Sequence, residues 1–386
     1  MTEPTQTPFT QVEPAEVASM PVPQEIETQK PPKSNGMIIL LIGLFVIGII
    51  TAIFFYYQYN VSNVNDQSGN STVDQQVIGL SMASLRVERW RYDRDRIIAE
   101  AEERGMLVNV TDANDDDGLQ ISQAENLILQ GVDVLIVIAN NGQTASRIVE
   151  LAHENNVKVI AYDRLILDSD LDFYVTFDSV EVGKKQAEGV VAAAGTKKNY
   201  AYIGGSETDY NTVLLKQGTM SVLQDKIDSG EINLVLDVFI TDWKQELAYQ
   251  TMKDFLAAGG QVDAVIAAND GNASGVIQAL KEYNLDGKVP VSGQDAEASA
   301  LIRILEGTQT MTVYKPLNAL AERAVELCEQ IMLGEMPEIS DYIDNGKIEV
   351  PTIYIPSVSV NKDNIEETVI KDGFHDYNEI FNSVTE

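Results

Sequence analysis

Four apolar runs in this chain each end in a cluster of polar residues. Each run is rich in Val, Ile, Leu and Ala and precedes a segment with helical spacing of apolar positions, which is the pattern of strand and crossover helix in a parallel sheet. The runs are residues 132–138, 157–161, 262–268 and 289–292. The clusters that follow them are Asn140-Asn141-Gly142, Tyr162-Asp163-Arg164, Asn269-Asp270-Gly271 and Gly293-Gln294-Asp295. Because small ligands bind beyond the carboxyl ends of strands in open α/β sheets, we expect these side chains to face a small, highly hydroxylated molecule.

The same alternation of strand and helix patterns covers the chain from residue 77 onward. Further strands are expected at residues 77–82, 107–110, 173–176, 200–203, 234–240 and 310–313. Helices are expected at residues 89–104, 122–130, 213–229, 244–258, 273–283 and 319–333. The alternation starts afresh near residue 200, which predicts two similar α/β lobes.

An uncharged segment at residues 37–57 precedes the alternating region. As a helix it would be about 31 Å long, close to the hydrocarbon thickness of a bilayer. Lys30 and Lys33 precede it, whereas the next basic residue is Arg86, so the positive-inside rule places the N-terminus in the cytoplasm. We therefore expect an uncleaved, single-pass transmembrane anchor in the cell membrane with an extracytoplasmic domain. A cleaved secretory signal is the alternative, which the long leader and the lack of an Ala-x-Ala site disfavour.

The segments on either side of the predicted anchor differ in composition from the alternating region. Residues 1–36 are rich in Pro, Glu, Gln and Thr, which predicts a disordered cytoplasmic tail. Residues 58–76 are rich in Asn, Gln, Ser and Asp, which predicts a flexible stalk.

Charge and cysteine content exclude several classes of function. The formal net charge is −32, from 27 Lys and Arg against 59 Asp and Glu, so the chain lacks the basic surface that a nucleic-acid partner requires. Cys328 is the single cysteine, which rules out an internal disulfide. With only His153 and His375 beside it, we expect no structural zinc site.

Sequence patterns for cofactors and nucleophilic catalysis are also missing. The chain has no Gly-x-Gly-x-x-Gly after its first strand, no phosphate-binding Gly-x-x-x-x-Gly-Lys-Ser/Thr and no Gly-x-Ser-x-Gly, so we expect no nucleotide cofactor. Residues 112–118 are acidic but their glycine falls one place late for a calcium loop, which favours an ordinary loop. No histidine lies near the strand ends, which disfavours an enzyme, although a carboxylate pair acting on glycosides remains open.

The two tryptophans occupy matching places in the two predicted lobes. Trp90 follows the first strand, and Trp243 follows the strand at 234–240. An indole packs well on the apolar face of a sugar ring, while the ring hydroxyls need fixed donors and acceptors at its edge. The placement therefore predicts one aromatic wall from each lobe, with core packing as the alternative for either residue.

Several of these segments resemble the bacterial D-xylose-binding protein family, the periplasmic sugar receptors of ABC transporters. The similarity covers about residues 77–378. It is carried by residues 85–90, 93–95, 161–164, 293–295, 307–316 and 368–374, of which the last two are long and specific.

The resemblance implies two Rossmann-like lobes joined by three hinge strands, a type I periplasmic binding protein fold. Lobe 1 is expected to comprise residues 77–180 with 313–347, and lobe 2 residues 181–312 with 348–378. Carried over by position, the implied sugar-binding residues are Arg89, Trp90, Asp163, Arg164, Asp209, Asn211, Trp243, Asn269, Asp295 and Lys315.

The resemblance further implies that the protein binds D-xylose or a related monosaccharide and presents the closed form to an ABC permease. A membrane sensor kinase is the alternative partner, since a tether would raise the local concentration of the sugar-bound form at one membrane partner. An enzyme acting on sugars is a third class, and a gene regulator is disfavoured because the predicted anchor stands where a DNA-binding segment would be.

Overall fold

The computed structural model describes residues 75–339 and 341–384. They lie in one compact unit, Asp74–Glu386. The predicted tail (1–36), membrane anchor (37–57) and all but the last two residues of the stalk (58–76) lie outside the described residues. Among the helices that are described, none combines the length and apolar character needed to cross a bilayer.

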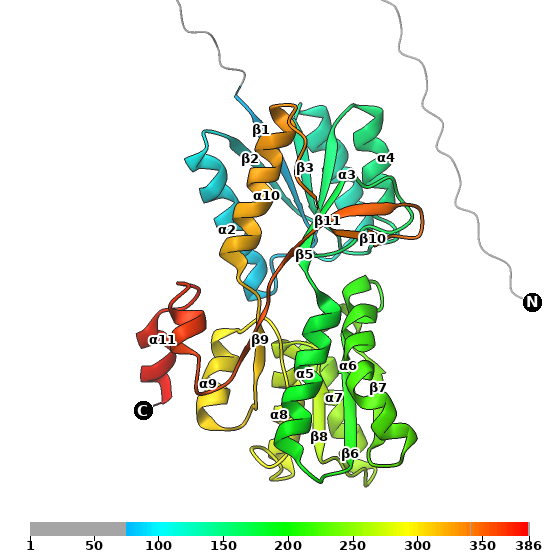
Figure 1. Cartoon of the computed structure of the whole chain (residues 1–386), viewed down its shortest axis with the longest axis vertical. Helices are drawn as coiled ribbons and strands as arrows, with labels where there is room; N and C mark the ends of the chain where they lie inside the picture. Colours follow the sequence, from blue (N-terminus) through cyan, green and yellow to red (C-terminus); the bar gives the residue numbers. More distant parts are fainter. Residues whose placement is uncertain (1–74, 340, 385–386) are drawn as a thin grey trace, which may run out of the picture. The chain divides into compact units, whose positions relative to one another are not determined.

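The first lobe is built on a seven-stranded sheet with the strand order β10-β11-β5-β4-β3-β1-β2 (Figure 1). In chain order its elements are β1 (Val77–Met82), α2 (Glu88–Glu103), β2 (Leu107–Asp112), α3 (Asp117–Leu129), β3 (Val134–Ile138), α4 (Ser146–Glu154), β4 (Lys158–Tyr162), β5 (Phe173–Phe177), α10 (Leu317–Met332), β10 (Asp341–Asp344) and β11 (Glu349–Ile355). All neighbouring strands pair in parallel except β10 and β11. The sheet confirms the predicted parallel α/β architecture.

Side chains of alternating direction divide the core of this lobe between the two faces of the sheet. Val134, Ile136 and Ile138 of β3 pack in a cluster with α2 and α10. Leu135 and Val137 pack on the opposite face with α3 and α4. Because both faces are covered, the central strand is apolar at every position, as its sequence indicated.

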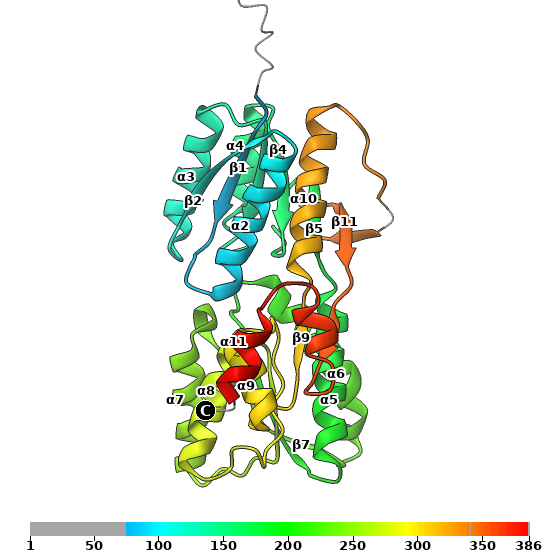
Figure 2. The same cartoon turned by 90° about the vertical axis from the view of Figure 1, so that its left-hand side faces the viewer.

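The second lobe, the lower one in Figure 1 and in Figure 2, contains a three-stranded parallel sheet with the order β7-β6-β8 and a two-stranded ribbon, β9 with β12. Its elements are α5 (Ser179–Ala194), β6 (Asn199–Gly204), α6 (Tyr210–Asp228), β7 (Asn233–Phe239), η1 (Thr241–Trp243), α7 (Gln245–Ala257), β8 (Ala264–Ala267), α8 (Asp270–Glu282), α9 (Ala298–Glu306), β9 (Thr312–Tyr314), β12 (Val358–Val360), η2 (Glu366–Ile370), α11 (Tyr377–Phe381) and η3 (Asn382–Val384). The predicted strand at 289–292 forms only an isolated bridge between Val291 and Val265. Pro290 lacks the amide hydrogen that a regular ladder requires.

The chain passes between the lobes three times: between β5 and α5, between β9 and α10, and between β11 and β12. The first two crossings lie near the expected boundaries. The third does not, because β11 pairs with β5 in the first sheet and residues 349–355 therefore belong to the first lobe. The expected division at 347/348 was wrong, and the crossing lies after Ile355, where β12 pairs with β9.

Candidate functional site

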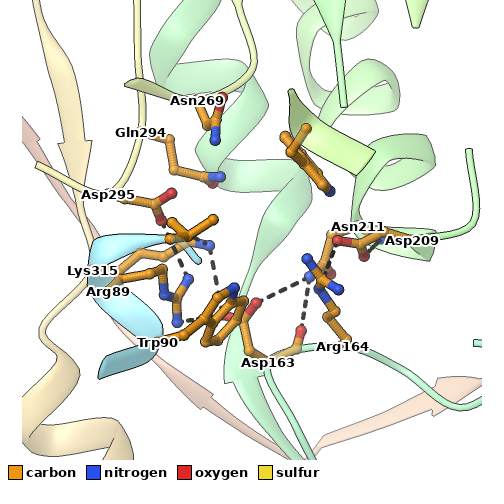
Figure 3. Close-up of a pocket in the computed structure, with 12 residues that line it drawn as sticks. Arg89, Trp90, Asp163, Arg164, Asp209, Asn211, Asn269, Gln294, Asp295 and Lys315 are labelled. Atoms are coloured by element: carbon orange, nitrogen blue, oxygen red, sulfur yellow. Dashed lines mark hydrogen bonds and ion pairs between the residues drawn. The ribbon is translucent and has the colours of Figure 1, made fainter. Parts of the chain in front are cut away.

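Twelve residues from both lobes line one pocket beyond the carboxyl ends of the strands (Figure 3). The pocket, together with the open space at its mouth, holds about 380 Å³ that is not filled by protein atoms. The structure brings all ten sequence-predicted residues together in its lining: Arg89, Trp90, Asp163, Arg164, Asp209, Asn211, Trp243, Asn269, Asp295 and Lys315. Val87 and Gln294 complete it.

Each of these side chains comes from a strand end, a helix start or a chain crossing. Arg89 and Trp90 open α2 just after β1, and Asp163 and Arg164 follow β4. Asp209 is the N-cap of α6, where its side chain accepts the amide of Asn211 at 3.0 Å. The polar N-cap residue that follows a strand thus lies at the pocket, next to the carboxyl end of that strand.

Asn269 is the corresponding N-cap of α8, and its side chain accepts the amide of Asn272. Asp295 lies in the loop before α9, and Lys315 lies in the crossing between β9 and α10. Helix α8 thus fixes one amide at the pocket, while the loop and the crossing supply one anion and one cation.

Three pocket residues hold the backbone in the left-handed region. The φ angle is 62° at Asp163, 55° at Trp243 and 94° at Asp295. Non-glycine residues adopt this conformation at an energetic cost, which is met at functional sites where the surrounding structure enforces it. At Asp163 the enforcement is visible, because its carbonyl oxygen accepts hydrogen bonds from Tyr174 and Thr176.

Arg89 joins the two lobes at the centre of the pocket. Its Nη2 lies 3.0 Å from Oδ2 of Asp163 in the first lobe, and its Nη1 lies 3.2 Å from Oδ1 of Asp295 in the second. The Lys315 ammonium lies between the same two carboxylates, at 3.5 and 3.6 Å. Two cations and two anions thus face one another where a ligand would be held.

A second pair of interactions crosses the cleft beside this group. Arg164 Nε of the first lobe lies 3.0 Å from Asp209 Oδ2 of the second. The Asn211 side-chain amide donates to the carbonyl oxygen of Asp163 at 2.8 Å. The lobes are therefore in direct contact through the same polar groups that line the pocket.

The two predicted aromatic walls both line the pocket. The ring of Trp90 has the guanidinium carbon of Arg89 at 4.2 Å from its centroid and that of Arg164 at 5.3 Å. Trp243 packs against Gly205, where a Cβ atom would overlap the indole ring. The placement of both indoles at one cavity agrees with the expected symmetric arrangement.

The charge environment keeps the central carboxylate ionised. Burial alone would raise the pKa of Asp163, but Arg89, Lys315 and Arg164 outweigh it and lower that pKa to about 2. Burial raises the pKa of Asp209 in spite of Arg164 beside it. Asp163 is therefore a permanent anionic acceptor at neutral pH.

Two buried polar atoms of the pocket have neither a hydrogen-bond partner nor an ion-pair partner among the described residues. They are the indole nitrogen of Trp243, a donor, and Oε1 of Gln294, an acceptor. Buried polar groups are rarely left unpaired in proteins, so both atoms are available to hydrogen-bond a ligand in the pocket. Hydroxyl groups satisfy donors and acceptors alike.

Sequence reasoning did not select Gln294, which lies beside Asp295, or Val87, which lies two positions before Arg89. Gln294 belongs to the polar cluster at 293–295. The cluster at 140–142 does not reach the pocket in the same way, because Asn140 and Asn141 donate to Asp117 at 2.6 and 3.0 Å. A strand-end cluster therefore marks the rim of the site, but the loop conformation decides which side chains face the cavity.

Three comparisons relate this site and fold to known proteins. Residues 78–336 match the family model described as periplasmic binding protein domain. A D-xylose-binding periplasmic protein of Haemophilus influenzae is 46% identical over 305 residues, covering 79% of this chain and 92% of that protein. One of Escherichia coli is 44% identical over 304 residues, covering 78% and 92%. An ABC transporter solute binding protein from Clostridium phytofermentans with bound β-D-glucose superposes with a TM-score of 0.75 at 28% identity, covering 79% of this chain and 100% of that structure.

Proposed function

This chain belongs to the periplasmic binding protein domain family, and on that basis we propose that it is an extracytoplasmic sugar-binding protein whose ligand is D-xylose or a closely related aldopentose. Both relatives are named as D-xylose-binding periplasmic proteins, which confirms the expectation that this chain is a binding protein and not an enzyme. The ligand identity rests on their names together with the chemistry of the pocket.

The observation that carries the proposal is the composition of the pocket lining. Ionised carboxylates, guanidinium groups and amides from both lobes surround a cavity bordered by two indoles. A monosaccharide offers an apolar ring face to indole and hydroxyls that donate to Asp and accept from Arg and Lys. Trp243 Nε1 and Gln294 Oε1, both buried and unpaired among the described side chains, fit the same ligand.

Sugar binding is proposed to favour the closed arrangement of the lobes. Because the lining comes from both lobes, a bound sugar contacts both at once, and this differential contact shifts the equilibrium toward closure. A dissociation constant in the micromolar range, equivalent to about −8 kcal/mol, suffices for uptake.

Isothermal titration of the full-length protein with D-xylose, L-arabinose, D-ribose and D-glucose tests the ligand. We expect heat of binding with D-xylose and its loss in Asp295→Asn, because Asp295 is buried at the pocket with Arg89 and Lys315. Asp237→Asn is the matched control, since Asp237 is partly exposed on β7 and pairs with Lys216. No response of the wild type to any of these sugars would remove the assignment.

We also propose that residues 37–57 tether the protein to the membrane and that it delivers its sugar to an ABC permease. Presentation of the sugar-bound form to a sensor kinase is the alternative. Deleting the gene separates the two: transport predicts lost sugar uptake, whereas sensing predicts retained uptake and lost sugar-induced transcription. Fractionation of cells expressing the chain with and without residues 37–57 tests the tether.

A further inference from the structure

Arg89 meets three carboxylates, one at each nitrogen of its guanidinium group. Nη1 and Nη2 face Asp295 and Asp163 at the pocket. Nε faces a third carboxylate, Asp93, whose Oδ2 lies 3.2 Å away. Asp93 is completely buried and does not line the pocket.

Asp93 is held in place by elements on two sides. It stands one helical turn after Arg89 on α2, so that the helix itself brings the two side chains together. From the sheet, the hydroxyl of Tyr162 donates a hydrogen bond to Asp93 Oδ1. Tyr162 is the last residue of β4 and directly precedes Asp163. The hydrogen bond between Tyr162 and Asp93 therefore joins β4, which positions Asp163, to α2, which carries Arg89.

We propose that Asp93 and Tyr162 are positioning residues for sugar binding: together they hold the Nε edge of Arg89 so that its two terminal nitrogens face the ligand. The inference rests on the proposed function. Arg89 is the group that touches the sugar, and Asp93 and Tyr162 act through it.

The arrangement of charges explains why this support matters. Arg89 and Lys315 both interact with Asp163 and Asp295. Without Asp93, Arg89 would have only Asp163 and Asp295 as anionic partners among these four side chains, and its guanidinium group would turn toward them. The sugar hydroxyls would then compete with tighter ion pairs and meet a less well oriented donor.

Asp93 also makes the support dependent on pH. Burial raises the pKa of Asp93 to about 6, although Arg89 and Tyr162 oppose the rise. The titratable groups that interact with it are Arg89, Tyr162, Asp163, Tyr92 and Tyr314. Protonation of Asp93 removes the negative charge at Arg89 Nε, so the wild type at low pH resembles a variant without that charge.

The test compares sugar affinity in the full-length wild type, Asp93→Asn, Tyr162→Phe and Asp95→Asn by titration calorimetry. Asp95 lies on the same helix but is exposed and pairs with Arg94, so its variant controls for a lost charge on α2. We expect affinity to fall on the order of tenfold in Asp93→Asn and a few-fold in Tyr162→Phe, with Asp95→Asn unchanged. Tyr162→Phe removes a single oxygen and keeps the proposal testable if Asp93→Asn does not fold.

The pH profile is the measurement that a purely structural role would not move. Wild-type affinity is expected to weaken a few-fold from about pH 7.5 to about pH 5.5, whereas Asp93→Asn lacks the part of this change that comes from Asp93. Asp270 and Glu297 of the second lobe also titrate in this region, with pKa values of about 7 and about 8. They are present in both proteins, so the difference between the profiles reports Asp93. Equal affinities and parallel profiles in wild type and both variants would overturn the inference.

A sugar-independent measurement separates this inference from the proposed function. The Arg89 Nε–H proton, followed by nuclear magnetic resonance, is expected to be protected from exchange in the wild type and in Asp95→Asn, and unprotected in Asp93→Asn. Failure of the wild type to bind any sugar counts against the proposed function, while unchanged protection of Arg89 in Asp93→Asn counts against the positioning role.

Discussion

Gly205 fixes the position of Trp243, and replacing it by alanine tests the aromatic wall of the second lobe. A Cβ atom at Gly205 would overlap three atoms of the indole ring, whereas the backbone there needs no glycine conformation. The added methyl group therefore clashes with the Trp243 ring and does not strain the main chain at position 205. Because Trp243 lies among Val182, Leu215 and other partly or fully buried side chains, the indole has to move toward the pocket.

Two magnitudes follow for Gly205→Ala. Overpacking of this kind costs about 1–3 kcal/mol in free energy of unfolding. Displacing an aromatic wall from a ligand ring removes about 0.5–1.5 kcal/mol of stacking, so sugar affinity should fall roughly 2- to 13-fold from stacking alone. A ring pushed into the cavity would add steric exclusion to this loss.

The assay is calorimetric titration with D-xylose together with urea unfolding followed by tryptophan fluorescence. Gly271→Ala is the matched control, because its Cβ would meet the side chain of the pocket residue Asn269 at ordinary contact distances of 3.6 and 3.7 Å. Being inside α8, that substitution should stabilise the helix by about 0.5–1 kcal/mol and leave affinity unchanged. Wild-type affinity in Gly205→Ala would refute the role assigned to Trp243.

Three further outcomes are expected. Burial raises the pKa values of Asp270 and Glu297 to about 7 and about 8, so the folded chain holds more protons than the unfolded chain between about pH 4 and about pH 8. The free energy of unfolding should therefore fall as the pH rises through this range, which urea titrations at several pH values can check. Asp163→Asn leaves Arg89 and Lys315 with one fewer anion at the pocket and should weaken sugar binding on the order of 100-fold by calorimetry, with a smaller effect contradicting its central place. Asn345→Ala removes two hydrogen bonds that the buried Asn345 amide donates to the carbonyl oxygens of Ile166 and Ser169, at 3.0 and 2.9 Å. The free energy of unfolding in urea should fall by about 2–4 kcal/mol, and a change below about 1 kcal/mol would show that the loop repacks.

The strand-end positions could be predicted because they follow from a local pattern and a general property of sheets. A run of buried residues identifies a parallel strand, and all such strands deliver their carboxyl ends to one edge. Asp163, Asn269 and Asp295 belong to the clusters that this pattern identifies, and the family resemblance implied them individually as site residues. The helix starts were less accurate: α3 begins at residue 117 and not 122, because Asp116 caps it by accepting the Leu119 amide at 2.7 Å.

The features that escaped prediction depend on contacts between residues far apart in the chain. The local pattern of residues 349–355 does not determine which strand they pair with, and β11 pairs with β5 of the first lobe. The third crossing was therefore misplaced. Arg89 and Asp93 have the spacing of an ordinary surface ion pair on a helix, and only the fold shows that both are buried. Gln294 and Asn140 occupy equivalent clusters, and their different orientations come from loop conformation.

The interactions across the cleft also bear on how a sugar would enter and leave. Arg89 with Asp295 and Arg164 with Asp209 join the lobes through groups that line the pocket. A sugar that bridges the lobes must therefore exchange these contacts for its own hydroxyl interactions, and the gain in free energy is the difference between the two sets. A buried ion pair contributes little net stabilisation, because the cost of desolvating its charges offsets most of their attraction. A polyhydroxylated ring can therefore replace them at small cost, whereas a ligand with fewer hydroxyls would leave charged groups unpaired and be rejected.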